Sequence, residues 1–279
     1  MDLGQATCFT IILALVTVRT LLLKRAVEHV SPDGMAMLAG VGTVVCCLVW
    51  WAGDAMLRSA PAVSFDRIGM TAGLLKGALL VLLMATQQRL LGRSLSAATY
   101  VFPIAVGLIA AIEACFFATP LSIGAIGGIG TLFLCGLVFA RHGHLAQMRR
   151  IDKRRFVLMV LLVVGFGLCD KIGIPRLGWW SYLLWTGIGS TVLGYLTGHR
   201  ATGIPLARAA FFGGTWALPE LFFNYSLQTW LPVAYGYFAI ALRVPLLMFI
   251  STQIYGEGSA RTQLMFGLLA VAGVALLFV

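Results

Sequence analysis

Apolar residues run in long blocks along this chain, and short polar stretches separate the blocks. Most blocks hold roughly 17–25 residues, the length that an α-helix needs to cross a hydrocarbon core about 30 Å thick. Within a block the apolar residues follow one another, as at 157–164, whereas the strands of a membrane barrel alternate. The pattern predicts an all-α polytopic membrane protein with ten transmembrane helices. These helices are predicted over residues 5–23, 34–53, 69–90, 95–117, 121–140, 156–174, 178–197, 204–226, 230–255 and 261–279.

The longest polar stretch, residues 141–155, separates the first five predicted helices from the last five. It carries six basic residues and no apolar stripe, so we interpret it as a basic linker loop. The chain is then a first five-helix repeat, 1–140, the linker, and a second five-helix repeat, 156–279. An odd number of helices inverts the second repeat in the membrane, and inverted repeats place a substrate site at their interface. The linker's His142 and His144 have no further ligand cluster beside them, which favours a solvated loop over a metal site.

Composition places the chain in a membrane. Hydrophobic residues make up 60% and charged residues 11% of the sequence, whereas soluble domains contain about 45–50% apolar and about 25% charged residues. The formal net charge is +10, but the basic residues are spread through short loops, so we expect a lipid bilayer and no nucleic acid as partner. Twelve Lys and Arg residues lie in loops after odd-numbered helices and three after even-numbered ones. This bias predicts a cytoplasmic loop 141–155 and external termini.

No sequence motif indicates catalysis or a bound cofactor. The six cysteines lie within apolar blocks without metal-ligand spacing, so we interpret them as small buried hydrophobes and expect no metal and no cofactor. The chain contains no G-x-S-x-G, H-E-x-x-H or P-loop motif. We therefore expect that the protein is not an enzyme, and an integral membrane enzyme and a scaffold subunit remain the alternatives.

A pattern of prolines and small residues occurs strongly in the second half and weakly in the first. Pro245 begins an apolar run that ends at a Gly256-Glu257 corner, and the helix after this corner carries Gly267 and Gly273. In the first half, a looser version of the pattern is formed by Ser31-Pro32, Ala85, Pro103, Gly130 and Gly136. In this pattern the chain resembles the drug/metabolite transporter superfamily, and specifically its EamA-like members.

This resemblance spans nearly the whole chain. It implies two five-helix repeats of opposite membrane topology around a central cavity, with transport by alternating access. The sequence departs from the family pattern at the corner between helices four and five, where the glutamate is missing and Glu113 lies about two turns earlier. It departs again in its loop charges, because ten-helix members usually have cytoplasmic termini.

Ionisable residues within the apolar blocks are the candidate site residues. A charge at the bilayer centre costs at least about 2.5–3.5 kcal/mol and usually faces a cavity or a partner. The chain has eight such residues: Arg19, Lys76, Glu113, Asp170, Lys171, Arg208, Glu220 and Arg243. Lys171 and Arg208 lie near predicted helix ends, where long side chains reach the interface, so we favour a structural role for both. The candidates for substrate binding or coupling are Glu220, Lys76, Glu113, Arg243 and Arg19, with Trp216 one turn before Glu220.

Charges of opposite sign occupy corresponding positions in the two halves. Lys76 in the third helix corresponds to Glu220 in the eighth. Arg19 in the first helix corresponds to Asp170 in the sixth. Such positions predict pairing across the repeat interface. The pairs are either static buried ion pairs or parts of a polar cavity where a glutamate takes up a proton as its partner or the substrate leaves, and we favour the cavity.

The eighth predicted helix combines helix-weakening residues with a carboxylate. Gly213-Gly214 and Pro219 loosen its backbone hydrogen bonds beside Glu220, which membrane helices tolerate chiefly next to protein or a water-filled cavity. We interpret it as a discontinuous helix that forms a binding wall, the alternative being a packing helix whose glycines allow close approach. Pro219 is a candidate hinge, as are Pro103 and Pro245 at matching places in the two repeats.

Together these features predict a secondary active transporter in the cytoplasmic (inner) membrane of the cell, with proton coupling as an option. Buried Arg19, Lys76 and Arg243 favour an anionic or zwitterionic small-molecule substrate, such as an amino acid or a phosphorylated compound. A flippase of a lipid-linked sugar phosphate is the alternative. We expect a monomer or a homodimer.

Overall fold

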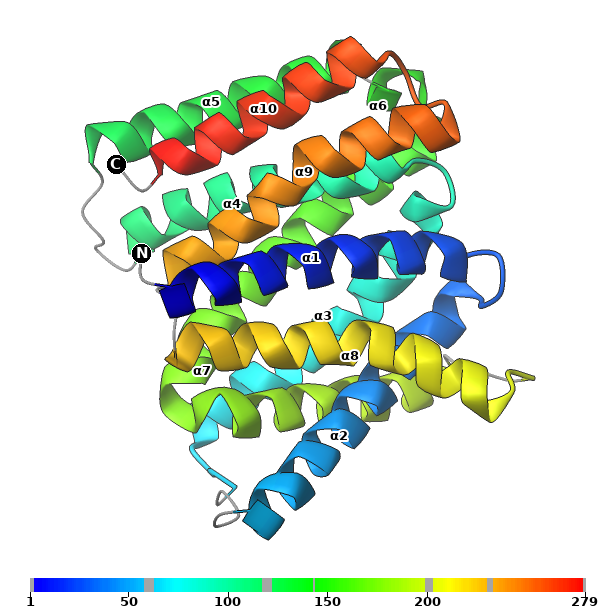
Figure 1. The fold of residues 1–279 in the computed structure, drawn as a ribbon, viewed down its shortest axis with the longest axis vertical. Helices are drawn as coiled ribbons and strands as arrows, with labels where there is room; N and C mark the ends of the chain where they lie inside the picture. The colour runs from blue at the N-terminus through cyan, green and yellow to red at the C-terminus, as the bar shows by residue number, and fades with distance from the viewer. Residues whose placement is uncertain are drawn as a thin grey trace. The chain divides into compact units, whose positions relative to one another are not determined.

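In a computed structural model, the secondary-structure elements of the described residues are α-helices (Figure 1). It describes residues 3–57, 63–116, 122–142, 144–198, 203–229 and 233–277, with all side chains except those of 142, 144, 227, 233–238 and 241. The helices are α1 (Leu3–Ala26), α2 (Pro32–Leu57), α3 (Arg67–Leu91), α4 (Leu95–Phe116), α5 (Ile123–His142), α6 (His144–Gln147), α7 (Arg150–Leu196), α8 (Leu206–Thr229), α9 (Val233–Tyr255) and α10 (Ala260–Leu276). No strand occurs in these ranges, so the predicted all-α class is confirmed.

The observed helices begin and end close to the predicted ones. The two helices predicted over 156–174 and 178–197 are both present within α7, where a kink at Gly178 (φ 71°, ψ 160°) separates them. Only a glycine takes up this conformation without strain. We name residues 150–177 the first arm of α7 and residues 179–196 its second arm. The predicted helix ends at 117, 121, 230 and 279, and the side chains of His142 and His144, lie outside the described residues.

Several helices have the length and composition of membrane-spanning segments. Within the described ranges, six of them are long and apolar enough to cross a membrane: α1, α2, α3, α4, α5 and α7. Large apolar side chains are exposed on these helices, among them Leu134, Leu137 and Leu161. A lipid environment suits such a surface, whereas water does not. The architecture is that of a multi-pass α-helical membrane protein, while ten spans and an inverted repeat stay predictions.

The predicted linker loop is shorter than expected. α7 begins at Arg150, so the basic residues 150–155 form its first turns instead of a loop. Lys and Arg are good helix formers, and the apolar pattern used for the prediction does not register charged turns that extend a helix. Asp152 stabilises this start, because its carboxylate pairs with Arg155 at 2.7 Å and lies at the positive end of the helix dipole.

The chain forms two compact units, and each unit combines segments from both halves of the sequence. Unit 1 consists of Met1–Thr17, Arg89–Val164 and Pro232–Val279, and it contains α4, α5, α9 and α10. Unit 2 consists of Val18–Gln88 and Gly165–Leu231, and it contains α2, most of α3, the second arm of α7 and α8. The predicted division into two repeats concerns symmetry rather than compactness, and it stays a prediction.

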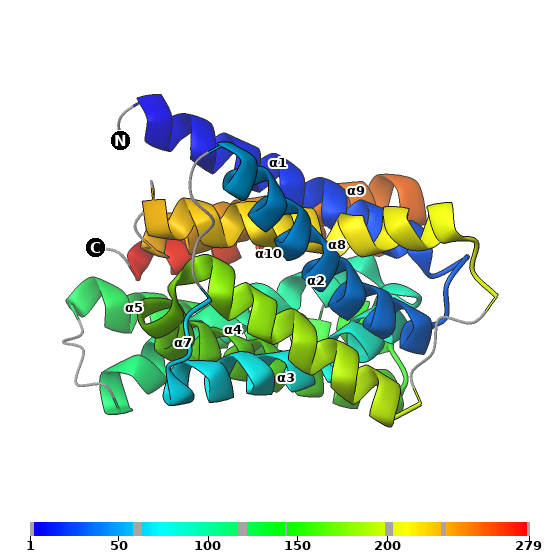
Figure 2. The same ribbon diagram turned by 90° about the horizontal axis from the view of Figure 1, so that it is seen from below.

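In unit 2, glycines let helices pack closely. A Cβ at Gly42 of α2 would meet the backbone of Gly213 in α8. A Cβ at Gly77 of α3 would meet the backbone of the second arm of α7 at Thr186 and Ser190, and the two segments run side by side (Figure 2). Small residues allow such approach between membrane helices, where hydrophobic burial does not drive association.

The predicted discontinuity of α8 is wrong. The helix runs unbroken from Leu206 to Thr229, through Gly213, Gly214 and Pro219. Gly213 is instead the contact with α2, the alternative that the sequence left open. The other two candidate hinges, Pro103 and Pro245, also lie inside unbroken helices, α4 and α9. Their hinge role stays a prediction.

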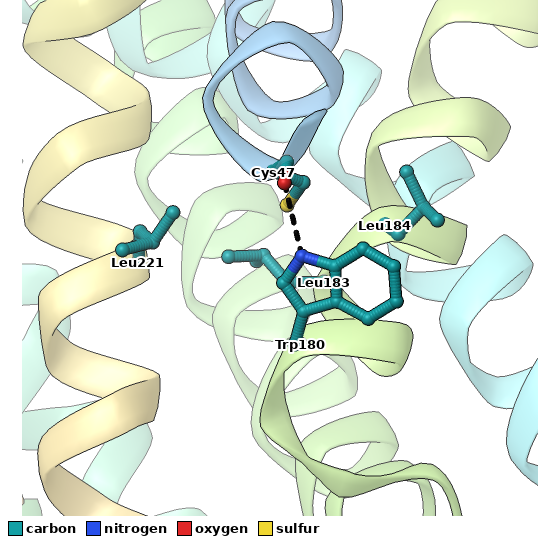
Figure 3. Packing of buried hydrophobic residues seen from close by; sticks show 5 residues of the cluster. All are labelled: Cys47, Trp180, Leu183, Leu184 and Leu221. Carbon is teal, nitrogen blue, oxygen red and sulfur yellow. Dashed lines mark hydrogen bonds between the residues drawn. The ribbon is translucent and has the colours of Figure 1, made fainter. Parts of the chain in front are cut away.

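An apolar cluster joins α2, α7 and α8 in the same unit. It contains Cys47, Trp180, Leu183, Leu184 and Leu221 (Figure 3). The indole Nε1 of Trp180 donates a hydrogen bond of 3.0 Å to the carbonyl of Cys47, so the buried indole has a polar partner. This packing fixes the second arm of α7 against its neighbours.

In unit 1, α5 and α10 lie side by side, and α9 packs on both α4 and α10 (Figure 1). Gly267 of α10 packs closely on α9, because a Cβ there would meet the backbone of Pro245. Gly130, its counterpart in the first-half pattern, has no neighbour within 4 Å of such a Cβ. Gly267 therefore allows two helices to pack closely, whereas Gly130 is not at a helix contact among the described residues.

Candidate functional site

Four buried charges from four helical segments meet in unit 2. They are Arg19 of α1, Lys76 of α3, Asp170 of the first arm of α7 and Glu220 of α8, and we name them the charge cluster. Lys76 Nζ lies 2.5 Å from Asp170 Oδ1 and 3.3 Å from Glu220 Oε1. Arg19 Nη1 lies 3.2 Å from Glu220 Oε2. The four groups thus form a chain in the order Arg19, Glu220, Lys76, Asp170.

Close helix packing buries Lys76 completely. Its neighbours along α3, Gly73 and Gly77, face the second arm of α7, where side chains at these positions would collide with that arm. The side chain of Lys76 is 0% exposed. Its ammonium lies 4.2 Å from the ring centroid of Phe166 and 5.1 Å from that of Tyr182, so aromatic faces complete its surroundings.

Glu220 is the most heavily bonded member of the cluster. Its two carboxylate oxygens face different bases, one each for Lys76 and Arg19. Asn224, one turn further along α8, donates to the Glu220 carbonyl at 2.8 Å and approaches its carboxylate at 3.5 Å. Trp216, one turn earlier, lies under the guanidinium of Arg19, with 4.6 Å from Cζ to the ring centroid. One face of α8 therefore supplies three polar side chains to the site.

Two buried polar atoms on this face of α8 have no hydrogen-bond partner among the described residues. They are Nε1 of Trp216, a donor, and Oδ1 of Asn224, an acceptor. Buried polar groups are nearly always satisfied, so such atoms mark places where water or a ligand group completes the bonding. They lie one turn on either side of Glu220.

The cluster is balanced in charge, with two bases and two acids. Burying an unpaired charge costs several kcal/mol, whereas a paired and hydrogen-bonded set is tolerated. The surplus of buried positive charge expected from the sequence is therefore not present in the cluster, because Asp170 and Glu220 neutralise Lys76 and Arg19. Binding of a charged solute here has to displace one of these pairs or bring a compensating charge.

Four predicted site residues lie in unit 2, and two lie in unit 1. The structure brings Glu220, Lys76, Arg19 and Trp216 together, and the pairing of Lys76 with Glu220 expected from the sequence is present. In unit 1, Arg243 of α9 is buried, donates to the Val16 carbonyl at 3.3 Å and lies 4.2 Å over the ring of Phe102. Glu113, also in unit 1, is half-buried near the end of α4.

The sequence interpretation underrated Asp170. It is a member of the cluster through Lys76, whereas the sequence predicted pairing with Arg19, which pairs with Glu220 in the structure. Depth in the membrane does not tell which helices adjoin. Asp170 could have been recognised as a site residue from the sequence, because it is a carboxylate inside an apolar block and corresponds to the basic residue Arg19 in the other half.

The sequence also gave no role to Glu257, whose carboxylate binds the start of α4. It accepts hydrogen bonds from the backbone nitrogens of Leu95 (2.7 Å) and Ser96 (2.9 Å) and from the hydroxyl of Ser94 (2.8 Å). A helix N-terminus has free N–H groups and a positive dipole end, which suit a carboxylate. The Gly-Glu corner between α9 and α10 is thus a cap on another helix, and the corner turns through Gly256 (φ 65°) and Gly258 (φ 73°).

Comparison with known proteins does not assign a function to the chain. No protein-family model matches the chain, and no curated protein matches it. The function is therefore argued from the charge cluster and from the helices that hold it.

Proposed function

We propose that this protein is a secondary active transporter, which moves a small anionic or zwitterionic solute across the cell membrane by alternating access. The observation that carries the proposal is the charge cluster itself, which joins four charged side chains inside a set of long apolar helices. Charges in such surroundings are expensive, and membrane proteins keep them chiefly on substrate and ion pathways.

The contacts within the cluster favour exchange of partners over a fixed ion pair. Lys76 lies within ion-pair distance of two carboxylates, and Glu220 lies within that distance of two bases. When one partner of either residue is protonated or bound by a solute, the other partner still neutralises it. In such a cluster the ion pairs can exchange while every buried charge keeps at least one partner of opposite charge. Alternating access needs such exchange, because a buried site must bind and release its solute.

The packing of the helices supports the repeat part of the proposal. In the predicted repeats, α4 corresponds to α9 and α5 to α10, and α4 packs on α9 as α5 packs on α10. Likewise α2 corresponds to the second arm of α7 and α3 to α8, and the contact of α2 with α8 has its counterpart in the contact of α3 with that arm. Exchange of the two halves maps these contacts onto one another. Repeats of five helices related in this way are inverted in a membrane.

The cluster follows the same exchange. The contact between Arg19 and Glu220 corresponds to the contact between Asp170 and Lys76, with the signs of the charges reversed. The central contact, Lys76 with Glu220, corresponds to itself. A site at the interface of two repeats has this arrangement, and inverted-repeat transporters bind substrate at such an interface.

The remaining parts of the proposal follow from the sequence. We place the protein among the drug/metabolite transporters of the EamA-like type, with ten spans, in the cytoplasmic membrane and without enzymatic activity. The segment 141–155, which joins α5 to α7 and includes the first turns of α7, is proposed to face the cytoplasm, because it carries the largest group of basic residues in the chain.

Reconstitution in liposomes tests the proposal. We expect saturable flux of at least one solute from a panel of amino acids and phosphorylated metabolites, and loss of that flux in the Lys76→Met variant. Movement of a lipid-linked sugar phosphate without solute flux would establish the flippase alternative. Chemical conversion without flux would indicate an enzyme, and absence of both a scaffold.

A further inference from the structure

The two carboxylates of the charge cluster are held differently. Glu220 accepts from Arg19 at 3.2 Å, from Lys76 at 3.3 Å and from Asn224 at 3.5 Å. Asp170 has one basic partner among the described residues, Lys76, at 2.5 Å. The side chain of Asp170 is also the most exposed of the four, at 15% against 11% for Glu220.

These differences decide which carboxylate accepts a proton more readily. A proton on Glu220 would leave Arg19 without its carboxylate. A proton on Asp170 leaves both bases beside the charge of Glu220, which lies within reach of each. Since an unpaired buried charge is the largest penalty available in this site, protonation of Asp170 is the less costly change.

Several titratable groups lie around Asp170. They are Lys76 from α3, Glu220 from α8 and Tyr182 from the second arm of α7, with Cys169 adjacent in the chain. The phenol and the thiol are neutral at ordinary pH. The repulsion between the two carboxylates is mutual and does not decide between them, so the ranking rests on their basic partners, two for Glu220 and one for Asp170 among the described residues.

The charge balance then links the proton to the charge of the substrate. With all four members ionised, the cluster is neutral. An anionic group that enters alone would bring one uncompensated negative charge into a site of low dielectric. One proton on Asp170 restores neutrality and leaves Lys76 free of one partner, so that its ammonium can bind the incoming group.

We propose, on the basis of the transport function above, that Asp170 is the proton carrier of the transporter and that its protonation frees Lys76 to bind an anionic group of the substrate. The O–H bond forms at the Asp170 carboxylate with a proton from the water on the side of entry. It breaks on the other side of the membrane, when the substrate leaves and the ion pair of Asp170 with Lys76 forms again. One proton accompanies each negative charge, and a zwitterionic solute needs none.

Infrared difference spectroscopy tests the assignment without a substrate. Purified protein in lipid bilayers is compared in acidic and neutral buffer, and the C=O stretching band of a protonated carboxylic acid is followed. We expect a titrating band in the wild type and its loss in Asp170→Asn. In Glu220→Gln the band should titrate only in more acidic buffer, because Asp170 is then the one carboxylate left in the cluster. The control Glu113→Gln, which removes a half-buried carboxylate of unit 1, should keep the band. Asp170→Glu should keep a titrating band at a shifted frequency, which separates a lost proton site from a misfolded variant.

Two results would overturn the assignment: a titrating band that remains in Asp170→Asn, or the absence of any titrating band in the wild type. The liposome panel keeps this inference apart from the proposed function. Flux of a solute together with either of those infrared results contradicts the inference alone. Absence of flux for the whole panel contradicts the transport function, and with it the proposed role of the proton. For an anionic solute that is transported, Asp170→Asn should lose substrate-driven proton uptake and keep solute exchange.

Discussion

The two units hold their buried charges in different ways. In unit 2, the four members of the charge cluster neutralise one another through side chains on four separate helical segments. In unit 1, the Glu257 carboxylate binds two backbone nitrogens and the Ser94 hydroxyl at the start of α4. Backbone partners are part of the fold, whereas side-chain partners can be replaced.

This difference indicates which buried charges serve function. A group bound to the end of a helix is released only when that helix moves or unfolds, so Glu257 stabilises structure. A group with two side-chain partners can exchange one for a solute or a proton. Buried ion pairs add little net stability compared with apolar residues of the same volume, so the cluster needs a reason other than folding. Under the proposed transport function we therefore expect the solute site in unit 2, and we expect a structural role for Glu257.

The largest expected effect is that of Lys76→Met. It removes the central base and leaves Asp170 and Glu220 with Arg19 alone, so we expect a loss of about 3–5 kcal/mol in the free energy of unfolding and no transport. SDS-induced unfolding in bicelles measures the stability. The combined variant Lys76→Met with Asp170→Asn should recover at least half of it, because Arg19 and Glu220 remain paired. A loss no larger than that of the control Arg208→Met, which removes an exposed base of the same unit, would contradict the buried cluster.

Glu257→Gln tests the other side of the comparison. The amide places N–H groups against the backbone donors of Leu95 and Ser96, so we expect a loss of about 1–3 kcal/mol in unfolding free energy. Protein that remains folded should transport at the wild-type rate. Glu113→Gln, which removes a half-buried carboxylate of the same unit, serves as the control for the loss of one acidic charge. Loss of uptake at unchanged stability would assign a transport role to unit 1.

Two glycines that correspond in sequence should respond differently to the same change. Gly267→Ala pushes a methyl group into the backbone of Pro245, and we expect a loss of about 1–3 kcal/mol from overpacking. Gly130→Ala meets open space and should raise stability by about 0.5–1 kcal/mol, since alanine is the better helix former. Thermal unfolding of both variants in detergent gives the comparison. Equal effects would mean that α10 does not pack on α9 through Gly267.

The smallest effect is expected at Trp216. Trp216→Phe keeps an aromatic face under Arg19 and removes the indole N–H, so stability should stay the same while substrate affinity falls if that donor contacts the solute. Trp216→Leu removes the face as well and should cost about 0.5–2 kcal/mol, the range of a cation–π contact. Unfolding measurements and uptake kinetics on both variants separate the two contributions. A larger stability loss in the Phe variant than in the Leu variant would contradict the stacking of Arg19 on the ring.

The positions of the helices could be predicted closely from the sequence, because the apolar length that spans a membrane is nearly fixed. The helix predicted over 69–90 is found at Arg67–Leu91, and the helix predicted over 95–117 ends at Phe116 in the described residues. The pairing of Lys76 with Glu220 could also be predicted, since a buried charge needs an opposite one. The basic turns at 150–155 were missed because helix propensity, rather than hydropathy, extends α7 there.

What the sequence could not supply is the set of neighbours in space. Asp170 joins the cluster because α3 lies beside the first arm of α7, and the spacing of residues in the sequence does not predict that these two helices are neighbours. Glu257 binds the start of α4, more than a hundred residues earlier in the chain, for the same reason. Gly213 looks like a helix breaker in sequence, and only the approach of α2 at Gly42 gives it a packing role.

The Glu220→Gln variant tests most directly whether the cluster acts in transport. The substitution keeps the volume and most of the hydrogen-bonding capacity of Glu220 while removing its charge, so Lys76 loses its second carboxylate. For a solute that the liposome panel identifies, we expect a monodisperse protein that still exchanges the solute and has lost concentrative uptake. The same uptake assay is then run on Glu220→Gln combined with Lys76→Met. Full recovery of both stability and flux in this double variant would contradict the account, because the cluster would then be a static ion pair.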